Sequence, residues 1–191
     1  MRFGKLEVLV NRKNDGLLRQ FKRIAISFAD FKEAHDIVSH IKKSNLYSDI
    51  DNNFLVLSAL TNAMIISYCK PFSGNDSRNK SKVPDLTNSA LKVLSSEELS
   101  LHKFLIQRRN QLIAHSDSQA IDIKFVIHSF GETQMLQPVR NRSSVCLNLE
   151  QLEVFESMSL KLLSYVANLR NDMEPSIIPL LTKEHTEDWG E

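Results

Sequence analysis

The sequence predicts a mainly α-helical protein, a helical bundle with a small β-hairpin inserted before the last long helix. Only five of the 191 residues are Gly and five are Pro, a composition that favours helices. Most of the chain carries apolar residues at helical spacing, and only residues 121 to 147 alternate in the manner of strands. The length fits one domain, expected over residues 1 to 175, followed by a loosely ordered tail over 176 to 191.

Two helices are predicted in the first half of the chain. Residues 16 to 43 carry apolar side chains at helical spacing with charges between them, which predicts a long amphipathic helix. An Asn- and Asp-rich turn is expected over 49 to 53. A second, more apolar helix should follow over 54 to 68 as the central core helix, stopped by Pro71. The polar, pattern-free residues 73 to 83 are expected to form a surface loop.

The second half of the chain predicts two more helices around a hairpin. Ser95 and Glu98 form a capping-box pattern for a helix that should end near His115. Residues 121 to 130 and a second stretch ending near 145 to 147 predict two strands joined at Gly131. Asn148 and Gln151 then resemble another capping pair, ahead of a helix over 149 to 170.

Charge and cysteine content exclude several classes of protein. There are 24 Lys and Arg residues against 23 Asp and Glu residues, so no overall field draws the chain to nucleic acid or to an anionic membrane. One local basic cluster could follow phosphates or be a plain solvated helix face; it consists of Arg12, Lys13, Arg19, Lys22 and Arg23. Two distant cysteines, no signal peptide and an interrupted apolar stretch predict a cytoplasmic protein without a membrane span.

The segment from Leu101 to Asp117 is the most informative part of the sequence. Here an apolar helix reaches Arg109-Asn110, and after a short gap Ala-His115-Ser-Asp117 follows. This pattern resembles the motif of the HEPN superfamily, in which an Arg, commonly followed by a polar residue, precedes a His near the end of a long helix. Upstream, the segment Tyr68-Cys69-Lys70-Pro71-Phe72 is similar to a Tyr-x-Arg-Pro-Phe segment of bacterial HEPN-like proteins, with Lys70 in place of the Arg.

The resemblance implies a HEPN-like bundle and metal-independent cleavage of RNA, in which a ribose 2'-hydroxyl attacks the neighbouring phosphate. The reaction needs a group that exchanges a proton near neutral pH and a cation for the growing phosphoryl charge. We assign His115 as general acid or base, Arg109 as the phosphate clamp and Asn110 as the residue that orients one of them. Neither a metal nor another cofactor is expected.

Helix geometry places Arg109 and His115 on different faces. Six residues separate them, which is about 9 Å along a helix axis and about 120° around it. Either the helix breaks before His115 or the motifs of two chains line one cleft, and the resemblance favours a homodimer. Arg108, seven residues before His115, offers a competing register. The residues expected to bind substrate are Arg108, His102, Lys70 and Asp117.

Three further interpretations stay open. The Arg109 to His115 segment could be an ordinary helix end, since a histidine there interacts well with the helix dipole. The chain could be a catalytically inert HEPN-like module that mediates protein association or binds a nucleotide or RNA. If active, it could be the toxin of a toxin-antitoxin or phage-defence system, silenced by an antitoxin protein. His35, Asp36 and His40 are poorly spaced for a metal site, so none is expected.

Overall fold

The computed structural model describes residues 15–72, 86, 88–113, 123–131, 133–140 and 147–181. It is mainly helical, with one two-stranded antiparallel sheet before the last long helix, which confirms the predicted fold class. The helices and strands, in chain order, are α1 (Asp15–Lys43), α2 (Ile50–Cys69), α3 (Ser96–Ile113), β1 (Ile123–Phe130), β2 (Thr133–Arg140) and α4 (Leu149–Ile177). Short 3-10 turns lie at Leu46–Asp49, Lys70–Phe72, Asn88–Val93 and Ile178–Leu180.

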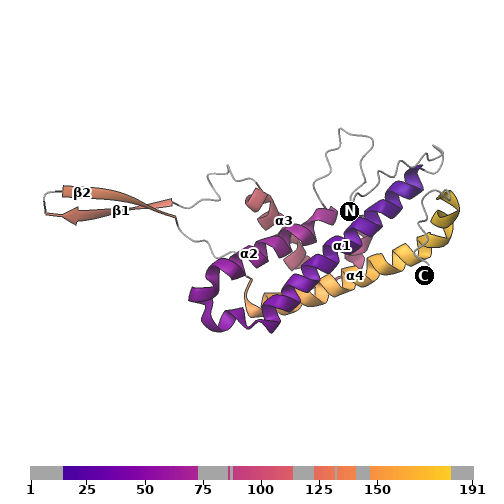
Figure 1. Cartoon of the computed structure of the whole chain (residues 1–191), viewed down its shortest axis with the longest axis horizontal. Coiled ribbons are helices and arrows are strands. Elements are labelled where there is room, and N and C mark those ends of the chain that lie inside the picture. The colour runs from indigo at the N-terminus through magenta and orange to yellow at the C-terminus, as the bar shows by residue number, and fades with distance from the viewer. Residues whose placement is uncertain are drawn as a thin grey trace, which may run out of the picture.

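The bundle is built on α1 and α4, which run side by side along its length (Figure 1). The second helix packs on α1, and the shorter α3 packs against both α2 and α4. Every helix contributes to one continuous apolar core. Its largest fully buried side chains are Ile24, Phe31, Ile41, Leu57, Met64, Ile65, Tyr68, Leu105, Leu147, Leu152, Phe155 and Met158.

Helix α1 matches its prediction, but the basic cluster at its start does not form one solvated face. Lys22 is exposed, whereas Arg23 is only 5% exposed. Arg23 and Asp30 are seven residues apart on the same side of α1. Burial raises the pKa of Asp30, and the Arg23 charge is one of the smaller effects that oppose this rise. The reading of Arg23 as solvated is therefore wrong, because this side chain is buried. Arg12 and Lys13 lie outside the described residues.

Helix α2 begins at Ile50, four residues before its predicted start. The Asp49 side chain is the cap: it accepts a hydrogen bond from the backbone N–H of Asn52 at 3.4 Å and another from the Asn52 side-chain amide at 2.8 Å. The polar run that resembles a turn is therefore the first turn of the helix, since Asp and Asn favour helix caps. At the other end Pro71 is buried in the 3-10 turn that follows α2, as its role as a stop predicts.

One stretch of the described residues, Leu46–Phe72, has the length and apolar composition needed to cross a membrane. The buried core helix of a soluble protein can have the same length and apolar composition. Leu57, Met64 and Tyr68 of this stretch are fully buried within the protein's own core.

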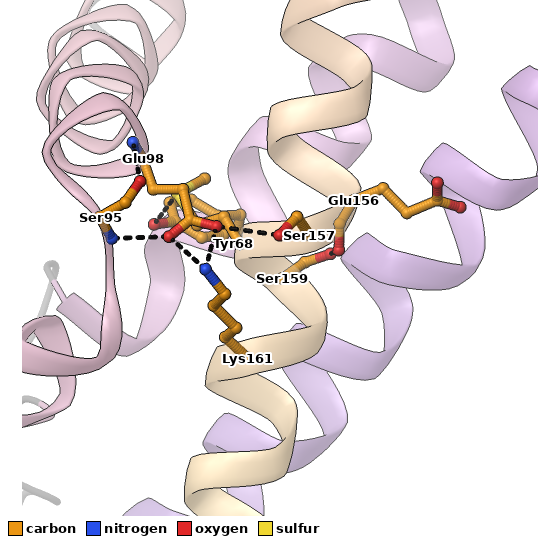
Figure 2. A network of polar contacts seen from close by, with 8 residues as sticks. Tyr68, Ser95, Glu98, Glu156, Ser157, Ser159 and Lys161 are labelled. Carbon is orange, nitrogen blue, oxygen red and sulfur yellow. Dashed lines mark hydrogen bonds and ion pairs between the residues drawn. The ribbon is translucent and has the colours of Figure 1, made fainter.

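The start of α3 is fixed to α4 by the polar network of Glu98 (Figure 2). Its carboxylate accepts the backbone N–H of Ser95 at 2.7 Å, and the Ser95 hydroxyl lies 3.2 Å from the Glu98 N–H, so the predicted capping box is present. The same carboxylate accepts hydrogen bonds from Ser157 at 3.0 Å and from the Lys161 ammonium at 2.8 Å, both on α4. Burial raises the pKa of Glu98, but these hydrogen bonds outweigh burial and hold that pKa below its ordinary value.

The hairpin of β1 and β2 is confirmed, and it projects away from the helices (Figure 1). Its register pairs Ile123 with Arg140 and Phe130 with Thr133 around Gly131, whose φ of 63° suits a residue without a side chain. The described part of the second strand ends at Arg140. Its predicted end near 145 to 147 lies largely outside the described residues.

Helix α4 begins at the predicted capping pair, with Asn148 and Gln151 exchanging side-chain to backbone hydrogen bonds. It ends at Ile177 rather than near Arg170. Pro175 lies inside the last turn, and the burial of Ile177 continues the apolar stripe past it. The loosely ordered tail predicted from residue 176 therefore begins with a last helical turn, and residues 182–191 lie outside the described part.

We predict that Glu98→Ala lowers the free energy of unfolding by about 1 to 3 kcal/mol, because Lys161, Ser157 and the Ser95 N–H lose their shared acceptor. The contribution is present above the ordinary glutamate pKa of 4.5 and is lost as pH falls through the lowered pKa of the folded state. Urea unfolding at pH 7 and pH 4 measures both effects. Glu97→Ala, an exposed acid next to it, is the control and should change stability little; equal losses would contradict the role of this network.

Candidate functional site

The two sequence segments that resemble HEPN proteins meet in the structure. Tyr68, near the end of α2, lies with its hydroxyl 2.9 Å from Nδ1 of His102 on α3. The Phe72 ring, in the turn after α2, packs edge-on against the His102 ring with centroids 4.8 Å apart. The upstream segment is thus part of the surface that holds the motif helix in place.

Tyr68 is a fully buried aromatic side chain at this junction. Its ring contacts the rings of Phe31 on α1, Phe72 and Phe155 on α4, with centroids 5.3 to 5.9 Å apart. The hydroxyl also lies 3.3 Å from the sulfur of Met158 on α4. Burial raises the pKa of Tyr68 well above its ordinary value, so the phenol stays protonated at neutral pH.

His102 is only 7% exposed and lines the core rather than an open surface. Burial lowers its pKa, and the neighbouring Lys103 charge lowers it further, so the neutral ring predominates at pH 7. These surroundings suit a structural, hydrogen-bonded histidine. Its role in substrate binding stays a prediction.

Arg109 and Asn110 lie at the far end of α3 from the capping box. Arg109 is half-buried, Asn110 is exposed, and the guanidinium donates a hydrogen bond to the Asn110 side-chain oxygen at 3.2 Å. Burial raises the pKa of Cys69, at the end of α2, to about 12, and the positive charge of Arg109 opposes that rise. The charge of Arg109 therefore acts on the end of α2 that carries the upstream segment.

Arg108, the competing register, is half-buried like Arg109, so burial does not distinguish the two arginines. His115 and Asp117 lie outside the described residues. Their assigned roles stay predictions that rest on the sequence resemblance.

Lys70 lies between two carboxylates of α1. Its ammonium is 3.5 Å from Asp30 Oδ1 and 3.5 Å from Glu33 Oε2, and Ser67 donates a hydrogen bond to Glu33 at 2.7 Å. Burial raises the pKa of Asp30 despite Lys70, whereas the Ser67 hydrogen bond lowers the pKa of Glu33. Lys70 is 48% exposed in its side chain, so it reaches solvent with its charge partly compensated. Neither Asp30 nor Glu33 was predicted from the sequence. Their spacing of three residues on one helix was the signal that could have identified this pair of acids.

The poorly spaced histidines of α1 have other partners. His35 Nδ1 lies 3.1 Å from the Ser159 hydroxyl of α4, and Asp36 pairs with Lys32 at 2.5 Å. Within the part of the chain that the structure describes, no three His, Cys, Asp or Glu side chains are grouped to hold a metal ion.

A groove of about 440 Å³ lies between α3 and the start of α4. It is lined by apolar side chains such as Phe104 and Val154 and by the carboxylates of Glu97 and Glu150. Acidic walls repel phosphate, so this groove is unsuited to an RNA backbone. The arginine end of α3 is the better candidate for contact with RNA.

Comparison with models of protein families, with curated proteins and with solved structures finds no match for this chain.

We predict that His102→Gln removes part of the loss of stability in mild acid. Because the folded-state pKa of His102 is lowered, its contribution is complete above the ordinary value of 6.5 and declines as pH falls below it, when the unfolded chain takes up the proton first. Urea unfolding at pH 7.5 and 5.5 compares the variant with wild type and with His40→Gln, a change at an exposed histidine. An unchanged pH dependence in His102→Gln would contradict the burial of a neutral ring.

Proposed function

We propose that this chain is a metal-independent endoribonuclease of HEPN type that uses Arg109 and His115. The observation that supports the proposal best is the meeting of the two resembling segments through Tyr68, Phe72 and His102. Two segments that resemble one family at distant places in the sequence, and that pack together in space, support the resemblance better than one short pattern would alone.

The local chemistry at Arg109 supports a role as phosphate clamp. The guanidinium is half-exposed at a helix end and is oriented by Asn110. Since the pKa of Cys69 is about 12, that thiol stays neutral at pH 7 and does not compensate the Arg109 charge. A fixed planar cation of this kind stabilises the charge that grows on phosphoryl oxygens.

His115 would supply the proton transfer. The ordinary pKa of a histidine side chain is near 6.5. A histidine can therefore accept the proton of the 2'-hydroxyl or protonate the leaving oxygen at neutral pH. Lys70, held by Asp30 and Glu33, would contribute a weaker, partly compensated positive charge to RNA binding. Arg108 and Asp117 complete the proposed contacts with substrate.

The proposal extends to the setting of the activity. A free ribonuclease in the cytoplasm would harm its host, so the chain would act as a toxin of a toxin-antitoxin or phage-defence system and be held silent by an antitoxin protein.

Two observations favour the alternative, an inert module for protein association. His102 of α3 lies in the core, and the projecting hairpin exposes large apolar side chains. Such surfaces mark binding between proteins. Cleavage of RNA in EDTA separates the two functions.

Cleavage of a labelled pool of structured RNA in EDTA tests the nuclease. We expect wild type to cleave, and Arg109→Ala and His115→Ala each to lower the rate by about 10²- to 10⁴-fold, the usual effect of losing a charge-stabilising group or a general acid or base. Arg108→Ala, tested beside them, shows whether Arg108 or Arg109 is the arginine that acts with His115.

Lys103→Ala is the matched control, because it removes an exposed cation from the same helix without touching the motif. Its rate should stay near that of wild type. Equal cleavage by all variants would point to a contaminating nuclease, and no cleavage by wild type would reject the enzyme in favour of the binding module.

A further inference from the structure

The hairpin of β1 and β2 carries different chemistry on its two sides. Side chains alternate along a strand, so one side of the hairpin carries Lys124, His128 and Phe130 of β1 together with Gln137 of β2. We call these four residues the His128 face. Phe125 lies on the opposite side of the same strand. Because the hairpin projects away from the helices, side chains on both of its sides are exposed (Figure 1).

Two nearly parallel aromatic rings lie on the His128 face. The ring centroids of His128 and Phe130 are 6.3 Å apart, and the ring planes are only 21° from parallel. Phe130 is 64% exposed, so most of its side chain meets solvent. A flat base stacked between two rings needs a separation of about 7 Å, twice the ordinary contact distance between carbon atoms. The spacing of these rings is close to that value, so the pair can stack a base with a small adjustment.

A hydrogen-bond donor for the edge of a base lies beside these rings. His128 Nε2 is 2.7 Å from the side-chain oxygen of Gln137. An amide oxygen only accepts hydrogen bonds, so His128 is the donor and the NH₂ group of Gln137 is left to donate to another acceptor. Gln137 is exposed, and its NH₂ group can therefore donate to the edge of a base stacked on the rings.

The charge of the strands favours an anionic ligand. The sequences of β1 and β2 contain Lys124 and Arg140 and no acidic residue, and Glu132 lies between them in the sequence. Lys124 is exposed and lies on the same side as the rings, six residues before Phe130 and about 20 Å from it along the strand. A few nucleotides of an extended strand can cover this distance, with a phosphate at the lysine and bases on the rings.

We propose that the His128 face binds single-stranded RNA. His128 and Phe130 stack bases, Gln137 donates a hydrogen bond to a base edge, and Lys124 holds a phosphate. Bases in a duplex are already paired and stacked on one another, so this face selects unpaired segments. Base stacking serves RNA and DNA alike, and only the choice of RNA rests on the proposed nuclease. The hairpin is then a second contact with RNA, distinct from the one assigned to Arg109.

Fluorescence anisotropy of a labelled single-stranded RNA of about 12 nucleotides measures this binding. The full chain carries His115→Ala, so that cleavage does not consume the RNA. We expect Phe130→Ala to raise the dissociation constant about 5- to 150-fold, the usual effect of removing one stacking ring, and Phe130→Trp to keep tight binding. Phe125→Ala is the matched control, because Phe125 is 65% exposed on the opposite side of the same strand. Its dissociation constant should stay near that of the parent chain.

A duplex and a single-stranded DNA of the same sequence complete the test. The duplex should bind more weakly than the single-stranded RNA, and the DNA no more tightly. Equal weakening by Phe125→Ala and Phe130→Ala, equal binding of the duplex, or tighter binding of the DNA would overturn the proposal. Cleavage in EDTA is measured separately. A wild type that does not cleave, with binding that depends on Phe130, rejects the nuclease alone; a wild type that cleaves, with binding unchanged by Phe130→Ala, rejects the hairpin contact alone.

Discussion

Tyr68 of α2 contacts side chains of the three other long helices, and we infer that the position of α3 depends on it. Its ring touches aromatic rings of α1 and α4 and of the turn after α2, and its hydroxyl reaches His102 on α3. A buried polar pair of this kind is specific, because a displaced α3 would leave a hydroxyl and an imidazole without partners inside an apolar core. The helix that carries Arg109 is thus held in one place.

Two anchors of different chemistry act on α3. At its start, Glu98 ties the capping box to Lys161 and Ser157 of α4 (Figure 2). One turn further along the chain, His102 ties it to Tyr68. The far end, with Arg109 and Asn110, reaches the surface, so a rigid support carries the residues to which we assign the chemistry.

Features encoded by neighbouring residues could be predicted from the sequence. The helix stripes, the pair of Ser95 with Glu98 and the pair of Asn148 with Gln151 each depend on a few positions, and the structure confirms them. The start of α2 was misjudged because Asp and Asn favour turns and helix caps alike.

Contacts between distant segments could not be predicted from spacing alone. The inward turn of Arg23, the two acids that hold Lys70 and the enclosure of His102 all depend on which helix packs against which. His102 shows the difficulty most clearly: seven residues before Arg109 it shares a helix face with the motif, yet that face meets Tyr68 and Phe72 of another helix and its turn. The roles of Arg109 and Asn110 rest on resemblance together with this packing.

A double-mutant cycle between Tyr68 and His102 tests most directly the claim that this buried pair fixes the motif helix. The free energies of unfolding of wild type, Tyr68→Phe, His102→Leu and the double variant are measured at pH 7.5. We expect a coupling of at least about 1 kcal/mol, because either single change leaves the other polar group buried without a partner. Strictly additive losses would contradict the claim and show that α3 is held by apolar packing alone.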